Sequence, residues 1–110
     1  MASMAGKVIL VTGATRGIGR AAVHKIASTG ATMILVGRDK SRVDEIVSEA
    51  KEISGCGPVS GEICDLLDQD EIRKLAERFK SQFTQLDVLI NNAGAIFTKK
   101  IKTAAGFERT

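Results

Sequence analysis

The chain has 110 residues, the length of a single domain, and its 44% hydrophobic and 26% charged residues are typical of a globular protein. Its net charge is +3, but sixteen Lys and Arg are interleaved with thirteen acidic residues, which argues against a nucleic-acid partner. Two cysteines with one distant histidine argue against a metal site. The lack of a signal-peptide pattern, or of the ~18 apolar residues that a membrane helix needs, favours a cytoplasmic protein without a membrane partner.

The first predicted element is a strand over Lys7 to Thr12, a short apolar run rich in β-branched residues that suits a parallel sheet buried on both faces. A glycine-rich turn follows. Residues Ile18 to Thr29 then predict an amphipathic helix that ends at Gly30. Its expected apolar stripe consists of Ile18, Ala22 and Ile26. His24 lies off this stripe and is expected at the surface.

Strand and helix alternate again in the middle of the chain. Thr32 to Gly37 repeats the pattern of a buried strand, and Ser41 to Ser54 predicts a helix. The apolar stripe of this helix is Val43, Ile46, Val47, Ala50 and Ile53. Pro58 to Ile63 is a weaker strand, because proline suits only its first position and Gly61 interrupts it, so we expect it at the outside of the sheet.

The last predicted helix begins at Asp68, which forms a plausible capping pair with Glu71. Its apolar residues are Ile72, Leu75, Ala76, Phe79 and Phe83. The last two are expected in the core and not as a stacking platform. Leu86 to Asn91 is the fourth strand. The order βαβαβαβ with right-handed crossovers predicts an α/β fold, a doubly wound parallel sheet with strand order 3-2-1-4. Ligands of such sheets bind at the carboxyl ends of the strands, where the winding reverses.

A glycine-rich motif joins the first strand to the first helix, where a dinucleotide pyrophosphate needs close backbone approach and a helix N-terminus. It comprises Gly13, Ala14, Thr15, Arg16, Gly17, Ile18 and Gly19. Gly13 permits a tight turn, Gly17 lets the backbone approach the phosphates, and Gly19 lets the helix pack on the strand. The alternative is a glycine turn without a ligand.

The spacing Gly-x-x-x-Gly-x-Gly, together with Asn91-Asn92-Ala93-Gly94 after the fourth strand, resembles the classical short-chain dehydrogenase/reductase family. The resemblance implies an NAD(P)-binding Rossmann fold, with Asp65 and Leu66 holding the adenine and with Asn92 and Ala93 near the ribose. From the residues alone, turn chemistry is an alternative for both asparagines, favoured for Asn91 but not for Asn92, and Asp65 could open the turn before the third helix.

The cofactor preference is predicted from the end of the second strand, where an acidic residue would accept the ribose hydroxyls of NAD. Here Gly37 leaves room, Arg38 offers a charge-assisted contact to a phosphate, and Arg16 approaches from the glycine loop. This pattern favours NADP(H). The alternative is that Arg38 is an exposed cation and Asp39 takes the ribose, which would favour NAD.

The family's catalytic pair is Tyr-x-x-x-Lys, with a serine, and the chain contains no tyrosine. The resemblance therefore implies that residues 1–110 are an incomplete dinucleotide-binding half-domain of an oxidoreductase that exchanges a hydride with a carbonyl or alcohol, with no catalytic residue among them. Residues 103–110 resemble the segment that leads into the next helix in retinol-dehydrogenase-like members of the family. The fourth strand would be a bare edge, so we expect aggregation or self-association.

Two other functions remain open from the sequence. A non-catalytic NADP-binding or interaction module would use the same cleft without turnover. A nucleotide-dependent methyltransferase shares the architecture, but the Asn-Asn-Ala-Gly motif and the basic Arg38 argue against it.

Overall fold

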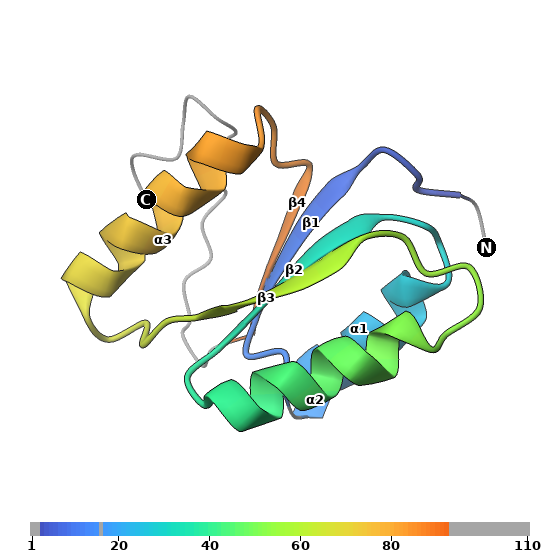
Figure 1. Cartoon of the computed structure of the whole chain (residues 1–110), viewed down its shortest axis with the longest axis horizontal. Helices are drawn as coiled ribbons and strands as arrows, with labels where there is room; N and C mark the ends of the chain where they lie inside the picture. The colour runs from blue at the N-terminus through green and yellow to red at the C-terminus, as the bar shows by residue number, and fades with distance from the viewer. Residues whose placement is uncertain (1–2, 16, 93–110) are drawn as a thin grey trace.

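The computed structural model describes residues 3–15 and 17–92. Its elements follow the chain as β1 (Val8–Thr12), α1 (Gly17–Ala27), β2 (Thr32–Gly37), α2 (Lys40–Lys51), β3 (Val59–Ile63), α3 (Gln69–Gln82) and β4 (Val88–Asn91). All strand pairs are parallel, and the sheet order is β3-β2-β1-β4 (Figure 1). The predicted doubly wound sheet and its strand order are confirmed.

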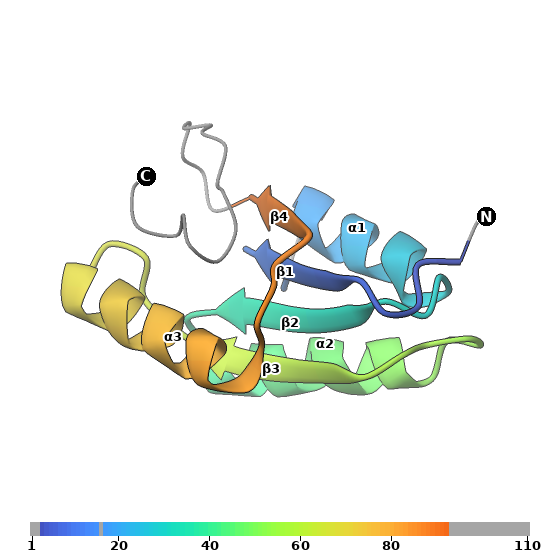
Figure 2. The same ribbon diagram turned by 90° about the horizontal axis from the view of Figure 1, so that it is seen from above.

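The sheet is covered on both faces. Helices α1 and α2 lie on one face and α3 lies on the other (Figure 2). Because side chains alternate along a strand, Ile9 and Val11 of β1 pack in the core beneath α1 and α2, whereas Val8 and Leu10 pack in the core beneath α3. Both cores reach into β2 in the same alternation, which explains why β1 and β2 are apolar throughout.

The predicted apolar stripe of α1 is only partly right, because Ile26 packs against the core but Ile18 does not. The buried residues are Gly19, Val23 and Ala27, while Ile18 is 76% exposed. A Cβ added at Gly19 would lie 2.0 Å from the carbonyl oxygen of Gly13, so a glycine here lets the helix pack closely against the loop. The buried face therefore reaches further round the helix than expected, to Val23 and Ala27. His24 is at the surface, as predicted, with Nε2 3.0 Å from Glu49 Oε1 of α2.

The stripe of α2 is confirmed, with Val43, Ile46 and Ala50 buried. The helix begins at Lys40, one residue before the predicted start, because Asp39 caps it. Gly61 in β3 has a role that the sequence did not indicate. A Cβ there would lie 2.5 Å from Val43 Cγ1, so the glycine allows α2 to pack against this edge strand.

The predicted capping pair of α3 is half right. Asp68 caps the helix and accepts hydrogen bonds from the backbone N–H groups of Asp70 and Glu71. The Glu71 carboxylate, however, accepts from Asp65 N at 2.7 Å, so it holds the preceding loop instead of the cap. The core position of Phe79 is confirmed, and its ring stacks on Phe83 at 4.9 Å. Ile72, another apolar residue of this helix, is 39% exposed.

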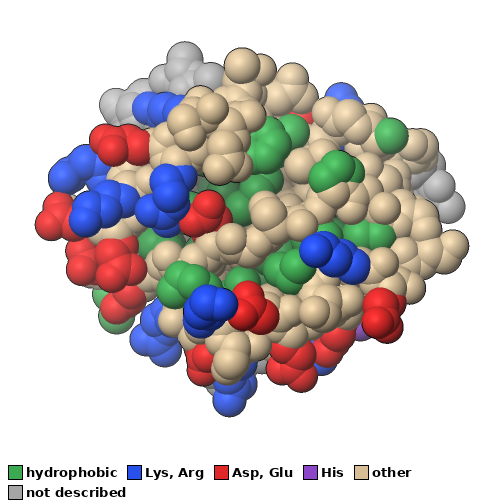
Figure 3. All heavy atoms as spheres, viewed as in Figure 1, with side chains coloured by type: hydrophobic (Ala, Val, Ile, Leu, Met, Phe, Trp, Pro, Cys, Tyr) green, Lys and Arg blue, Asp and Glu red, His purple; other side chains and the backbone are tan. Residues whose placement is uncertain are grey.

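Strand β4 begins at Val88, two residues later than predicted, and within the described residues it pairs only with β1. Val88 is 37% exposed. Self-association through this edge stays a prediction. Figure 3 shows basic and acidic side chains interleaved on the visible face. In the described part of the chain, no helix is long and apolar enough to span a bilayer, and no three His, Cys, Asp or Glu residues gather in a way that could hold a metal.

Candidate functional site

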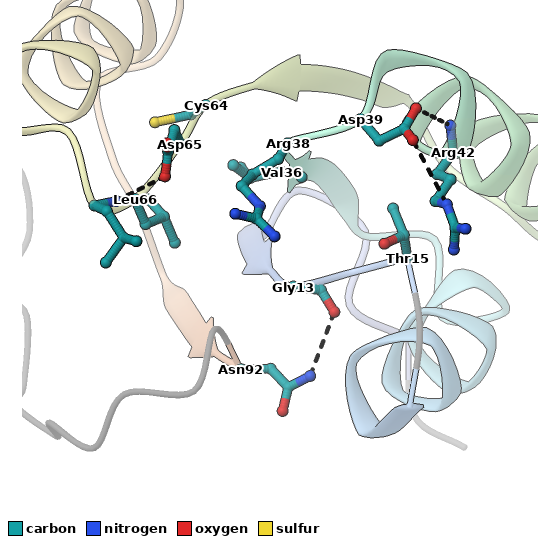
Figure 4. Close-up of a pocket in the computed structure, with 12 residues that line it drawn as sticks. Gly13, Thr15, Val36, Arg38, Asp39, Arg42, Cys64, Asp65, Leu66 and Asn92 are labelled. Atoms are coloured by element: carbon teal, nitrogen blue, oxygen red, sulfur yellow. Dashed lines mark hydrogen bonds and ion pairs between the residues drawn. The ribbon is translucent and has the colours of Figure 1, made fainter.

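A cleft of about 970 Å³ opens at the carboxyl ends of the strands, where doubly wound sheets bind their ligands (Figure 4). It is lined by the first loop, the ends of β2 and β3, the start of α2 and the residue after β4. The lining residues are Gly13, Thr15, Val36, Gly37, Arg38, Asp39, Arg42, Cys64, Asp65, Leu66, Leu67 and Asn92. The tertiary structure thus brings together residues that are up to about eighty positions apart in the sequence.

Two residues of the glycine loop have a backbone conformation that suits glycine. Gly13 and Gly17 have φ of 63° and 61°, in the left-handed region that favours glycine. A Cβ added at Gly17 would meet no heavy atom within 4 Å, so open space lies beside the start of α1. The first turn of α1 carries no acidic side chain, and its positive dipole end therefore remains suited to an anion.

The other loop residues divide between the cleft and the core. Thr15 lines the cleft. Ala14 does not, because it is fully buried and its N–H donates to the Val36 carbonyl at 3.4 Å. Gly19 is buried against Gly13, and the exposed Ile18 is not among the lining residues. Arg16 lies outside the described residues.

The end of β2 forms one wall of the cleft. Arg38 is exposed and lines it. Gly37 does not simply leave room for a ligand, as the sequence suggested. A Cβ there would lie 2.9 Å from Val43 Cγ2 and 3.2 Å from Thr15 Cγ2, so the glycine lets α2 and the first loop close over the strand.

Asp39, the residue that would accept the ribose of NAD in the alternative interpretation, is the N-cap of α2. Its Oδ1 accepts hydrogen bonds from Ser41 N at 3.0 Å and Arg42 N at 3.4 Å. The Ser41 hydroxyl also donates to it and, with the Arg42 N–H, lowers the pKa of Asp39. The carboxylate is therefore charged and already engaged by its own helix.

The loop after β3 forms the opposite wall. Asp65 and Leu66 line the cleft, as the resemblance implied, but the Asp65 carboxylate also accepts from Leu67 N at 3.0 Å. The turn role that the sequence left open is therefore present in the structure. Cys64 is buried beside them, and burial raises the pKa of its thiol, which keeps it protonated at neutral pH.

The ends of β1 and β4 are tied together by Thr12. Its hydroxyl donates to Asn91 Oδ1 at 3.0 Å and accepts from Asn92 N at 3.0 Å. The Asn92 side-chain amide then donates to the Gly13 carbonyl at 3.3 Å, as Figure 4 shows. Asn92 thus links the end of β4 to the glycine loop and lines the cleft at the same time. Ala93 lies outside the described residues.

Sequence reasoning missed three parts of this site. Arg42 lines the cleft from the first turn of α2, and a signal for it existed, because the cap at Asp39 fixes which residues begin the helix. Leu67 also lines the cleft, one residue after the predicted Asp65-Leu66 pair. Thr12 was assigned only to a strand, and nothing in a strand pattern marks a hydroxyl that bridges two strand ends.

Comparison with known proteins identifies the class that this fold and cleft define. The family described as short chain dehydrogenase matches residues 7–110, and the chain belongs to this family. Human retinol dehydrogenase 12 is 39% identical over 103 residues, which cover 94% of this chain and 33% of that protein. A 3beta-hydroxysteroid dehydrogenase of Mediterraneibacter gnavus is 38% identical over 94 residues, which cover 86% of this chain and 33% of that protein.

Solved structures agree with the sequence relatives. The complex of Pseudomonas aeruginosa RhlG with NADP superposes with a TM-score of 0.75 and 30% identity, covering 84% of this chain and 36% of that one. L-sorbose reductase from Gluconobacter frateurii, complexed with NADPH and L-sorbose, superposes with a TM-score of 0.76 and 32% identity, covering 90% of this chain and 37% of that one. The chain spans about a third of the length of the curated relatives it matches.

Proposed function

We propose that this chain is the NADP(H)-binding part of an oxidoreductase of the short-chain dehydrogenase type. The observation that carries the proposal is the cleft itself, in which the glycine loop, the basic Arg38 and the Asp65-Leu66 pair meet at the carboxyl ends of the strands. Two structural relatives are described as complexes with NADP or NADPH, which supports this cofactor class.

The residues present fit a dinucleotide. The positive φ of Gly13 and Gly17 opens the backbone at the start of α1, and the space beside Gly17 is unfilled. A pyrophosphate would be held by the loop and by the helix N-terminus, with the Thr15 hydroxyl as a further donor and with Ile18 and Gly19 in the first turn. Arg16 belongs to the same proposed set.

The remaining proposed contacts lie along the two walls. Asp65 and Leu66 would hold the adenine, while Asn92 and Ala93 would lie near a ribose. Arg38 would bind the 2′-phosphate, which gives the preference for NADP(H) over NAD. The engagement of Asp39 as a helix cap supports this preference, because its carboxylate is already used within α2.

Catalysis of hydride transfer by the family's mechanism would need an acid/base residue that these 110 residues do not contain. The bound nicotinamide would exchange a hydride with a carbonyl or alcohol, and this chain's own residues would bind and orient the cofactor. The family's acid/base tyrosine is not among these residues, since the chain has no tyrosine. A second candidate, left open by the sequence, is a non-catalytic NADP-binding module. A coding message that continues in frame to a Tyr-x-x-x-Lys motif would favour the oxidoreductase.

The proposal is tested by titrating the purified chain with NADPH and NADH and reading the nicotinamide fluorescence. A matched pair of variants assigns the binding to the glycine loop. Gly17→Asn and Gly17→Asp have nearly the same shape, and both residue types tolerate a positive φ better than most others do, but only the aspartate adds a negative charge beside the proposed pyrophosphate.

We expect NADPH to bind the parent chain, and we expect Gly17→Asp to bind it about tenfold or more weakly than Gly17→Asn. Equal affinities of the two variants would contradict the placement of the phosphates. Failure of the parent chain to bind either dinucleotide would contradict both candidate functions.

A further inference from the structure

The first turn of α2 presents a charged pair to the cleft. Asp39 Oδ2 lies 3.6 Å from Arg42 Nε, three residues later in the chain, and both residues line the cleft. Asp39 Oδ1 is occupied by Ser41 and by the Arg42 N–H. Each oxygen of the carboxylate therefore has a partner within the same helical turn, and the acid at the end of β2 works as a cap and a counter-ion.

Arg42 lines the cleft, and its contact with Asp39 leaves guanidinium N–H donors available for a ligand. Its side chain is 55% exposed, and the contact to Asp39 is longer than a hydrogen bond. Figure 4 shows Arg42 and Arg38 on the same cleft, with Thr15 between them in this view. Lys40, the other cation in this turn, pairs with Asp44 at 2.8 Å and is not among the lining residues.

We propose that Arg42 is a second binding residue for the 2′-phosphate, acting beside Arg38, and that Asp39 orients it and does not accept the ribose. This inference rests on the proposed function. A guanidinium that keeps most of its donors open binds phosphate strongly, and two arginines that line one cleft can act on the same phosphate. The pair also explains how an acid at the end of β2 is compatible with a phosphate beside it.

The test uses two probes that differ only by the phosphate in question, adenosine 2′,5′-bisphosphate and adenosine 5′-monophosphate. Both lack nicotinamide, so they need only the part of the cleft described above. Their affinities for the purified chain are measured by titration calorimetry. We expect Arg42→Gln to weaken the bisphosphate about fivefold and to leave the monophosphate within about twofold.

A matched control is available in α3. Arg73 pairs with Asp70 at the same three-residue spacing, at 3.1 Å, and is similarly exposed, but it is not among the residues that line the cleft. Arg73→Gln should leave the affinities of both probes unchanged. Arg42→Lys, which keeps the charge but loses the planar donors, should recover part of the bisphosphate affinity.

The role of Asp39 is tested by Asp39→Asn, since asparagine caps a helix as well as aspartate does. Asp68→Asn at the cap of α3 is its control. If Asp39 only caps α2 and orients Arg42, monophosphate affinity stays within about twofold of the parent chain. A clear loss of monophosphate affinity would show that Asp39 accepts the ribose and would overturn the inference.

The adenosine probes distinguish a failure of the proposed function from a failure of the role proposed for Arg42. If the parent chain binds neither adenosine probe, the proposed function is lost and this inference with it. If the parent chain binds both probes and Arg42→Gln leaves their affinity ratio unchanged, the cleft is a dinucleotide site and only the assignment of Arg42 is wrong.

Discussion

Gly19 of α1 lies directly against the carbonyl oxygen of Gly13. A Cβ added at Gly19 would lie 2.0 Å from that oxygen and 2.8 Å from the Asn92 side-chain nitrogen. The same carbonyl accepts the Asn92 amide at 3.3 Å. The first helix, the loop before it and the residue after β4 are therefore packed around one backbone group. This packing is possible because Gly19 has no side chain.

We expect Gly19→Ala to destabilise the fold by about 2–3 kcal/mol, because the clash is with backbone atoms that cannot move aside as a flexible side chain would. Gly17→Ala is the comparison. It has open space around it and costs only the strain of a positive φ, about 1–2 kcal/mol. Urea denaturation of the two variants and the parent chain measures this. A smaller loss for Gly19→Ala than for Gly17→Ala would contradict the packing described for α1.

Thr12→Val removes the hydroxyl that links the ends of β1 and β4 while keeping the side-chain shape. The Asn92 N–H loses its acceptor, and we expect a loss of about 1–2 kcal/mol in unfolding free energy. Thr12→Ser keeps the hydroxyl and should retain most of the stability. If valine and serine cost the same, the hydroxyl bridge contributes nothing and the methyl group is the important part.

Arg38→Gln should lower the affinity for NADPH about tenfold and leave the affinity for NADH within about twofold, because only NADPH carries the 2′-phosphate. Arg38→Lys should fall between the parent chain and the glutamine variant, since it keeps the charge without the fork. The ratio of the two dinucleotide affinities is the measurement. An unchanged ratio would show that Arg38 is a solvated cation with no part in cofactor preference.

Asp87 gives a pH dependence. Its Oδ2 accepts from Val8 N at 2.8 Å and from the Gln85 amide at 2.7 Å, and these hydrogen bonds, the first above all, lower the pKa of Asp87 below its ordinary 3.8. A lowered carboxyl pKa stabilises the folded state above the unfolded pKa, and this contribution is lost as the pH falls through the folded value.

Thermal unfolding between pH 2 and pH 6 should therefore show a melting-temperature difference between the parent chain and Asp87→Asn that is present above about pH 4 and shrinks below it. Other carboxylates change the melting temperature of both proteins alike. A difference that is constant across this range would contradict the role given to the charged Asp87.

Much of the fold follows from local patterns. The buried strands β1 and β2 were predictable because parallel strands covered on both faces must be apolar throughout. The outer position of β3 followed from Pro58 and Gly61. The stripe of α1 was not predictable from its own residues, since Ile18 is the more hydrophobic candidate and only the contact with Gly13 makes the helix bury Gly19 instead.

By itself the sequence determined the doubly wound sheet and the positions of the glycine loop and Arg38, because these depend on residue types at the ends of strands and on chain order. The Asp65-Leu66 pair was implied by the family resemblance. Only the tertiary structure decided that Arg42 lines the same cleft as Arg38 and that Thr12 joins two strand ends. The cleft and the Thr12 bridge both bring together segments that are apart in the sequence, and such segments meet only after the helices and strands have packed.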